Sequence, residues 1–302
     1  MPDLRPIREF IETLGPVDPE KPVLLAGPTA VGKSAYALEL AKRDGRAIVN
    51  ADALQVYDGW EILTARPTAA DLGQARHYLY GHVNYQNRYS VGDWLRNVAP
   101  LIAQRPAPII IGGTGLYFRA LTNGLADIPP SSPEIRAQAT EKLESEGLDA
   151  LLSDLDAQTL ARIDQLNPMR VQRAWEVQRQ TGRGLAAWHE ETGPALVSLD
   201  QAHAVVLAAD PAVLGQRIDQ RFDAMLAQGA MSEVAARAAD WDPARQSSQA
   251  IGAPELMAAW FGKLPLDQAV DSAKTSTKQY AKRQRTWFRN KMSEWMSYIV
   301  HS

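Results

Sequence analysis

Cysteine is absent from the 302 residues of this chain. Without thiols the protein can form neither a disulfide framework nor a zinc site with thiolate ligands. Long apolar runs are absent too, since no stretch approaches the roughly 18 apolar residues of a membrane span. The segment MPDLRPIREFIE lacks the basic-then-apolar layout of a secretory signal. We therefore expect a cytoplasmic protein with no membrane segment.

Acidic residues are missing from one window, 272–293, which holds seven basic residues. The rest of the chain carries 25 basic against 35 acidic residues, a net charge of −10. A basic segment on an acidic body is typical of polyanion binding, although a solvated helix face has the same composition. Aromatic residues among these cations either pack the segment onto the core or stack on bases. The seven cations are Lys274, Lys278, Lys282, Arg283, Arg285, Arg289 and Lys291.

A phosphate-binding motif, G-x-x-x-x-G-K-[ST], is present at 27–34. It follows the apolar run 23–26 and precedes a helical pattern, which is the context that such a loop requires. The Gly-rich turn presents backbone N–H groups to phosphate, the lysine adds a cation, and the Ser34 hydroxyl is the expected ligand of Mg²⁺. The motif is typical of nucleotide and ATP binding. Its residues are Gly27, Pro28, Thr29, Ala30, Val31, Gly32, Lys33 and Ser34.

Two more apolar runs, 47–49 and 107–111, lead into Asn50-Ala-Asp52 and Gly112-Gly-Thr-Gly115. Such runs indicate strands buried on both faces of a parallel sheet, in which ligands bind at the carboxyl ends of the strands. We therefore expect the phosphate loop, Asp52 and Thr114 to converge on one site. Asp52 is either a general base or a residue that caps a turn.

The predicted fold is α/β, a P-loop core whose parallel sheet is flanked by helices. A turn-rich break near 122–133 opens a helix-rich segment, so we predict an all-helical insertion domain at 123–195 within a core of 1–122 and 196–302. Expected helices within the insertion include Asp156–Leu166. In the core we expect helices at Leu214–Ala227 and from Asp271 to about Trp295.

A convincing Walker B acid is lacking, because the strand at 109–111 ends in Gly-Gly-Thr-Gly. This disfavours an ATPase or GTPase, which needs that acid to anchor Mg²⁺ and position a water. A transferase fits better, with Asp52 deprotonating an acceptor and Thr114 bonding the acceptor or the leaving group. A small-molecule kinase that uses ATP and a non-catalytic RNA-binding protein remain alternatives.

Several segments together resemble the tRNA dimethylallyltransferase (tRNA isopentenyltransferase) family. They occur in the family's order, they span most of residues 24–290, and the combination of GGTGLYF with AKRQRTWFR is highly specific. The segments are GPTAVGKS at 27–34, NADALQVYDGWEILTARPT at 50–68, YSVGDW at 89–94, PIIIGGTGLYFRAL at 108–121, NPMRVQRAWEV at 167–177, RIDQRFDAMLAQG at 217–229, QAIGAPE at 249–255 and TKQYAKRQRTWFR at 277–289.

The resemblance implies transfer of a dimethylallyl group from dimethylallyl diphosphate to the N6 amine of an adenosine. That adenosine lies directly 3′ of the anticodon in tRNAs that read codons beginning with U. Mg²⁺ assists, diphosphate leaves, and the phosphate loop binds the isoprenoid diphosphate. The partner is the tRNA anticodon stem-loop, and we expect a monomeric enzyme. The close rival is an adenylate isopentenyltransferase, but a free nucleotide acceptor needs neither the insertion nor the basic helix.

The resemblance also assigns roles to individual residues. Asp52 matches the general base, and Thr114 and Arg217 match residues that bind diphosphate or line the reaction channel. Arg136, in SPEIR, lies in a further matching segment. Positions expected to contact tRNA are Asp52, Ala53, Leu54, Gln55, Thr114, Arg136, Arg170, Arg173, Gln249, Ile251, Gly252, Lys282, Arg283 and Arg285. The chain departs from the family pattern at Ala53 (usually Ser), Leu63 (usually Gly), Gly81 (usually Asp) and Ala253-Pro254 (usually Tyr and a cation).

Overall fold

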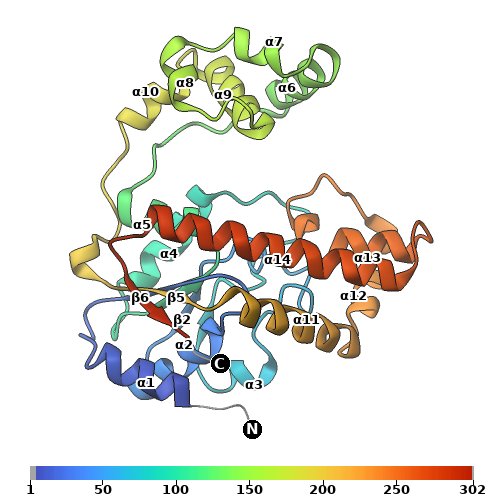
Figure 1. The fold of residues 1–302 in the computed structure, drawn as a ribbon. Coiled ribbons are helices and arrows are strands. Elements are labelled where there is room, and N and C mark those ends of the chain that lie inside the picture. The colour runs from blue at the N-terminus through green and yellow to red at the C-terminus, as the bar shows by residue number, and fades with distance from the viewer. Residues whose placement is uncertain (1–4, 301–302) are drawn as a thin grey trace. The chain divides into compact units, whose positions relative to one another are not determined.

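The computed structural model describes residues 5–300. Within this range six strands form one parallel sheet in the order β3-β2-β4-β1-β5-β6 (Figure 1). The central strand β1 is hydrogen-bonded to β4 on one side and to β5 on the other. The sheet confirms the predicted α/β fold. The strands are β1 (Val23–Ala26), β2 (Ile48–Asn50), β3 (His77–Tyr78), β4 (Ile109–Gly112), β5 (His203–Ala208) and β6 (Met296–Ile299).

The loops after β1, β2 and β4 leave the same edge of the sheet, because the strands run in one direction. The register sets their level: Ala26 pairs with Gly112, and Asn50 pairs with Ile111. The phosphate loop, Asp52 and Thr114 therefore all lie just beyond the aligned ends of neighbouring strands, at this edge of the sheet.

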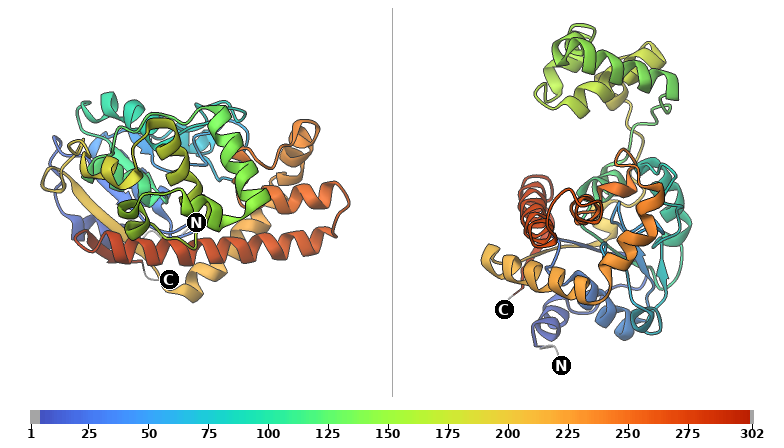
Figure 2. Two further views of the ribbon diagram at one scale, coloured as in Figure 1. Left: turned by 90° about the horizontal axis from the view of Figure 1, so that it is seen from above. Right: turned by 90° about the vertical axis from the view of Figure 1, so that its right-hand side faces the viewer.

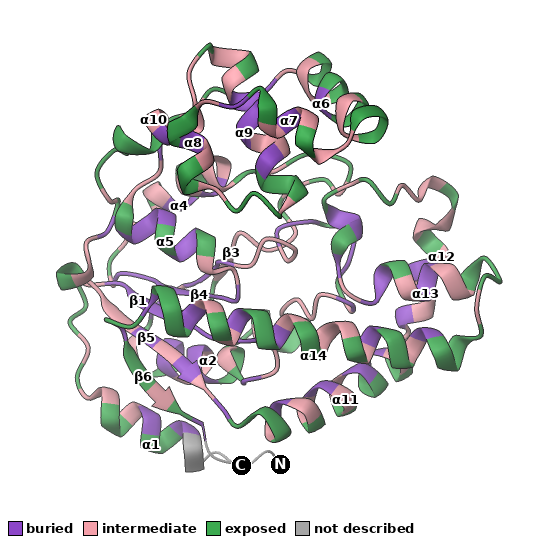
Figure 3. Ribbon diagram, turned by 45° about the horizontal axis from the view of Figure 1, so that its top comes forward, coloured by how far each residue is buried: buried purple, intermediate pink, exposed green. Residues whose placement is uncertain are grey.

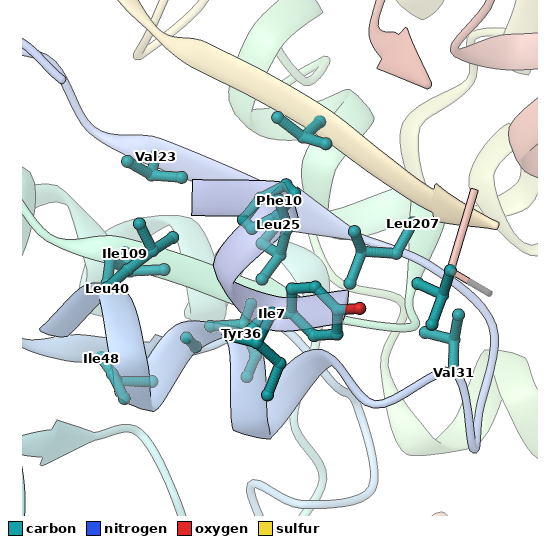
Figure 4. Close-up of a cluster of buried hydrophobic side chains, with 14 of the residues drawn as sticks. Ile7, Phe10, Val23, Leu25, Val31, Tyr36, Leu40, Ile48, Ile109 and Leu207 are labelled. Carbon is teal, nitrogen blue, oxygen red and sulfur yellow. The ribbon is translucent and has the colours of Figure 1, made fainter. Parts of the chain in front are cut away.

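Two apolar layers cover the faces of the sheet. On one face α1 (Arg5–Leu14) and α2 (Lys33–Asp44) pack Phe10 edge-on against Tyr36, with ring centroids 5.1 Å apart (Figure 4). On the other face lie α4 (Val91–Ile102), α5 (Gly115–Asn123) and the last turns of α14 (Leu266–Lys291). There the buried Trp94 indole donates to the Asn50 carbonyl at 2.8 Å, which ties α4 to the end of β2.

A third apolar cluster joins the helices that follow β5. α14 packs against both α11 (Pro211–Ala227) and α13 (Ala253–Trp260) (Figure 2). Phe222, Met225, Leu256 and Ala273 are buried in this cluster. It fixes α14 across the carboxyl edge of the sheet. The remaining short elements of the core are α3 (Ala69–Leu72), α12 (Ala230–Arg237), η1 (Leu199–Gln201), η2 (Ala238–Asp240) and η3 (Ser247–Gln249).

Backbone contacts divide the chain into two compact units, and the second comprises Asn123–Leu196. It is all-helical and has its own core, in which Ala139, Leu151, Val171 and Ala174 are fully buried (Figure 3). Asn167 caps one of its two 14-residue helices by accepting from the Arg170 N–H, with Pro168 in the first turn. Its helices are α6 (Pro133–Glu146), α7 (Leu148–Ser153), α8 (Ala157–Arg162), α9 (Pro168–Thr181) and α10 (Leu185–Glu190).

Some helix boundaries differ from the sequence expectations. The helix expected to run to Trp295 ends at Lys291, because the chain turns there to add β6 to the sheet, and Trp295 packs edge-on against Phe118. The helix expected at 156–166 ends at Arg162, since Ile163 adopts an extended conformation. Among the described residues, no helix is both long and apolar enough to span a bilayer.

Candidate active site

The phosphate loop connects β1 to the first turn of α2. Gly32 at the turn has a φ of 103°, a conformation that favours glycine. The Lys33 ammonium donates to the carbonyls of Gly27 and Pro28, both at 2.9 Å. Within residues 5–300 no protein group accepts from the backbone N–H groups of Ala30, Gly32, Lys33 or Ser34. Free N–H groups at a helix N-terminus form an anion-binding site.

The loops after β2 and β4 are hydrogen-bonded to each other beside the phosphate loop. Asp52 donates its N–H to the Asn50 side chain at 2.9 Å, and its Oδ1 accepts from the Leu54 N–H at 3.0 Å. The Thr114 hydroxyl accepts from the Ala53 N–H at 2.9 Å. Among the described residues no group donates to Asp52 Oδ2, so this oxygen is free to accept a hydrogen bond from a ligand. Thr114 holds the Asp52 loop in place.

One cavity of about 410 Å³ is lined by the phosphate loop and Asp52, whereas Thr114 is not among its lining residues. Arg217 Nη1 donates to the Val31 carbonyl at 3.4 Å, and Arg221 Nη1 lies 3.5 Å from the Thr29 hydroxyl. Both arginines come from one face of α11, four residues apart. The cavity is lined by Thr29, Ala30, Gly32, Lys33, Ser34, Ala35, Asp52, Gln55, Thr64, Ala65, Ile111, Gly112, Arg217, Arg221, Tyr280 and Gln284.

The charges in this cavity favour an anion. Burial lowers the pKa of Lys33 to about 8, a shift that the Asp52 carboxylate opposes and the Arg221 cation increases. Burial also lowers the pKa of Arg221, and Asp52 again opposes the shift. Burial raises the pKa of Tyr280, with a further increase from Asp52. These cations have been withdrawn from water and face a single carboxylate. An anionic ligand that binds beside them therefore stabilises their charged forms.

A small apolar pocket of about 80 Å³ adjoins the anion cavity. It shares Asp52, Arg221 and Tyr280 with that cavity, so a ligand can place a phosphate in one and an apolar chain in the other. Its mostly apolar lining suits the hydrocarbon part of a ligand. Its apolar lining consists of Leu54, Leu63, Ile218, Phe222, Met225, Ala250 and Ile251.

Five of the seven basic residues of α14 form two groups. Lys274 and Lys278, here called the paired lysines, form ion pairs with Asp223 at 2.6 Å and Asp219 at 2.8 Å on α11. The free cation stripe consists of Lys282, Arg285 and Arg289, for which the described part of the chain provides no ion pair. The stripe lies along a groove of about 970 Å³ with apolar walls.

Sequence comparison decides the family. A tRNA dimethylallyltransferase of Cereibacter sphaeroides is 56% identical over 285 residues, which is 94% of this chain and 91% of that protein. The sequence model of the family described as IPP transferase matches residues 55–291, and that of Isopentenyl transferase matches residues 21–84. The chain belongs to the tRNA dimethylallyltransferase family. This confirms the resemblance carried by the sequence motifs. A tRNA dimethylallyltransferase of Roseobacter denitrificans is 55% identical over 281 residues, 93% of this chain and 99% of that protein.

Solved structures have the same fold. A tRNA isopentenylpyrophosphate transferase from Bacillus halodurans matches with a TM-score of 0.66 at 32% identity, over 93% of this chain and 90% of that one. A eukaryotic dimethylallyltransferase described as acting on tRNA matches with a TM-score of 0.76 at 25% identity, over 93% of this chain and 74% of that one.

The tRNA-contact positions that were expected within the tRNA dimethylallyltransferase core have distinct surroundings. Gln55 lines the anion cavity and donates to the Thr64 and Ala65 carbonyls at 2.8 and 3.0 Å. Ile251 lines the apolar pocket. Gln249 is exposed and donates to the Pro243 carbonyl at 2.9 Å. Gly252 has a φ of 97°, and a Cβ there would lie 3.0 Å from Phe222 and 3.2 Å from Leu63.

Three expected tRNA contacts belong to the second unit. Arg136 Nε donates to the Ser131 carbonyl at 3.0 Å, and Arg173 Nη1 donates to the Ser131 hydroxyl at 2.7 Å. Arg170 is exposed and lies 3.6 Å from an Asp164 oxygen. Arg136 and Arg173 thus hold the segment around Ser131, here called the strap, that leads into α6. Arg170 is exposed at the surface.

Sequence reasoning missed three residues of the cavity. Arg221 is one of them, although its four-residue spacing from Arg217 on one helix predicts that both side chains reach the same site. Tyr280 and Gln284 lie four residues apart on α14 and line the cavity. Their spacing was the available signal, but it was obscured by the surrounding cations.

Proposed function

We propose that this enzyme transfers a dimethylallyl group from dimethylallyl diphosphate to the N6 amine of the adenosine 3′-adjacent to the anticodon, in tRNAs that read codons beginning with U. The observation that supports this most directly is the union of the anion cavity, the Asp52 carboxylate and the apolar pocket in one site. A diphosphate ester of a short hydrocarbon chain matches both compartments.

The phosphate loop and the arginines of α11 would bind the diphosphate. The free N–H groups of the loop, Lys33, Arg217 and Arg221 stabilise negative charge where it develops as the bond between C1 and the diphosphate oxygen breaks. The five-carbon chain would occupy the apolar pocket, with Leu54, Leu63 and Ile218 against its methyl groups. Diphosphate leaves with the bonding electrons.

Asp52 would act as the general base. The exocyclic amine of adenine is a poor nucleophile because its lone pair is delocalised into the ring. Asp52 Oδ2 would take the amine proton as the bond between N6 and C1 forms. Thr114 would act by holding the Asp52 loop through the Ala53 N–H. To reach the cavity, the target base must leave the stack of the anticodon loop.

Mg²⁺ fits the donor groups of the site. No cluster of three acidic or histidine residues occurs among the described residues, so an all-protein cage is not expected. Mg²⁺ characteristically keeps waters and binds substrate phosphates with one or two protein ligands. The Ser34 hydroxyl, exposed at the start of α2 and lining the cavity, would be such a ligand. The bound ion would neutralise charge on the leaving diphosphate.

The anticodon stem-loop would contact both units of a monomeric, cytoplasmic enzyme. In the core, the free cation stripe would bind phosphates, and the loop 52–55 with Gln249, Ile251 and Gly252 would surround the target base. In the second unit Arg170 is the exposed candidate, with Arg136 and Arg173 supporting the strap beside it. On α14, Arg283 lies over the Tyr280 ring at 5.8 Å, where it would contact the RNA backbone near the cavity.

One assay distinguishes the candidate reactions. Labelled dimethylallyl diphosphate is incubated with the enzyme and unmodified tRNA, AMP, or no acceptor, and ATP with candidate small-molecule acceptors is tested in parallel. We expect label in tRNA at the adenosine next to the anticodon. Label in AMP but not in tRNA would instead identify an adenylate isopentenyltransferase, and ATP turnover without prenyl transfer would identify a kinase.

A further inference from the structure

Gln284 is a buried side chain on α14 that bridges two loops of the site. Its Oε1 accepts from the Thr29 N–H of the phosphate loop at 2.8 Å. Its Nε2 donates to the Gly113 carbonyl, in the loop after β4, at 2.9 Å. The side chain is only 6% exposed. A buried amide that satisfies one donor and one acceptor from two different loops constrains both loops, because moving either one leaves a buried group unpaired.

The two bridged loops come from neighbouring strands. The β1–β4 ladder ends with the pair Ala26 and Gly112, so beyond this level the sheet no longer holds the loops together. The Gln284 amide connects the loops further on, at Thr29, three residues beyond Ala26, and at Gly113, one residue beyond Gly112. It therefore extends the connection between the strands from the sheet into the site.

The space around Gly113 shows how closely this bridge is fitted. A Cβ at position 113 would lie 2.3 Å from Gln284 Nε2 and 3.4 Å from Asp52 Oδ2. The bridged backbone is thus adjacent both to the amide and to the oxygen that would accept the proton. Glycine at this position permits the amide to reach the carbonyl.

The helix that carries Gln284 is anchored on both sides of it. Trp287 packs so closely on Gly115 that a Cβ there would lie 2.2 Å from its ring. Phe288 is buried in the cluster beneath α4 and α5. Tyr280, one turn before Gln284 on α14, lines the cavity beside it. The amide therefore projects from a fixed helix, so it can define the position of the loops.

We propose that Gln284 is a positioning residue that sets the distance between the diphosphate in the phosphate loop and Asp52. The proposal rests on the proposed function. There the diphosphate leaves C1 of the transferred group, while Asp52 takes the proton of the amine that bonds to the same carbon. Binding of either substrate alone does not require the distance to be correct, whereas transfer does. Loss of the bridge should therefore lower kcat far more than it weakens the binding of either substrate.

Gln284→Met tests this with a side chain of similar length that lacks both hydrogen-bonding groups. We expect kcat to fall about 10- to 100-fold, while the dissociation constants of dimethylallyl diphosphate and tRNA change by less than about threefold. The matched control is Gln279→Met, on an exposed position of the same helix, which should retain wild-type kcat. A kcat for folded Gln284→Met within threefold of wild type would overturn the proposal, as would equal losses in binding and kcat.

A second pair of variants approaches the bridge from its other side and covers the case in which Gln284→Met does not fold. Gly113→Ala should displace the amide and lower kcat in the same way. Combining it with Gln284→Ala removes the clash, so the double variant should lose no more kcat than Gln284→Ala alone. Fully additive losses would refute the bridge as the shared cause.

Hydrogen exchange separates this proposal from the proposed function. In wild type the Thr29 amide should exchange slowly, and in Gln284→Ala it should exchange at least about tenfold faster, whatever the acceptor of the prenyl group. Rapid exchange of Thr29 in wild type would disprove the bridge. If wild type transferred no prenyl group to tRNA while Thr29 stayed protected, the proposed function would fail and the bridge would stand.

Discussion

The affinity of the site for diphosphate should depend on the protonation of Lys33. Burial holds its pKa at about 8 in the free enzyme, against an ordinary value of 10.5. A bound diphosphate places negative charge beside the ammonium and raises the pKa again, so binding above pH 8 takes up a proton. If binding restores the ordinary value, raising the pH from 7.5 to 9.5 should weaken binding about 20-fold.

Calorimetry with dimethylallyl diphosphate in the absence of tRNA measures this directly. Repeating the titration in buffers of different ionisation enthalpy gives the number of protons taken up, which should approach one near pH 9. Tyr280 does not interfere, because burial raises its pKa above the ordinary value and out of this range. Lys33→Met should bind weakly at all pH values and show a flat profile.

Asp52 provides an internal check on the same experiment. Its carboxylate raises the pKa of Lys33. Asp52→Asn should therefore move the inflection of the binding profile to lower pH. A wild-type affinity that stays constant between pH 7.5 and 9.5 would refute the link between diphosphate binding and the protonation of Lys33. An unchanged inflection in Asp52→Asn would show that Asp52 does not influence the pKa of Lys33.

Three further outcomes are expected. Asp52→Asn should lower kcat about 10²- to 10⁴-fold and leave the tRNA dissociation constant within about twofold, which single-turnover kinetics and filter binding can measure; full turnover would exclude a role as base. Neutralising the free cation stripe should reduce the salt slope of tRNA binding by about 2 to 3, whereas neutralising the paired lysines should change it by less than 1; equal effects would contradict the division of α14. Gly112→Ala places a Cβ 2.0 Å from the Ala51 carbonyl oxygen and should cost at least about 3 kcal/mol in thermal unfolding, whereas Gly193→Ala, which meets nothing within 4 Å, should cost less than about 0.5 kcal/mol.

Features set by local sequence were predictable. The phosphate loop, the three strands around it and the convergence of Asp52 with Lys33 follow from apolar runs that end in specific polar residues. In a parallel sheet those ends must meet, so no knowledge of packing was needed. The helical insertion was predicted from a different local signal, namely its helix-forming composition and the turn-rich segments that bound it.

Features set by packing between distant segments were not predictable. Lys274 and Lys278 looked equivalent to Lys282 in the sequence, and only the position of α11 shows that they are already neutralised. The hydrogen-bond partners of Gln284 could not be read from the sequence, because they lie 171 and 255 residues away. The strands β3 and β6 were missed, since two and four residues at the ends of a sheet carry little periodicity.

The distance along the chain between Thr29 and Gln284 has a consequence for biosynthesis. Ribosomes add about 5–20 residues per second, so the phosphate loop emerges roughly 10 to 50 s before the helix that fastens it. During that interval the nascent chain carries an unfastened loop next to exposed apolar strands. A chain that ends before α14 lacks Gln284 and also Phe288, Met292 and Trp295 of the core, so neither the bridge nor the packing around it can form until the last helix has been made. Synthesis of the last helix thus acts as the step that switches the enzyme on.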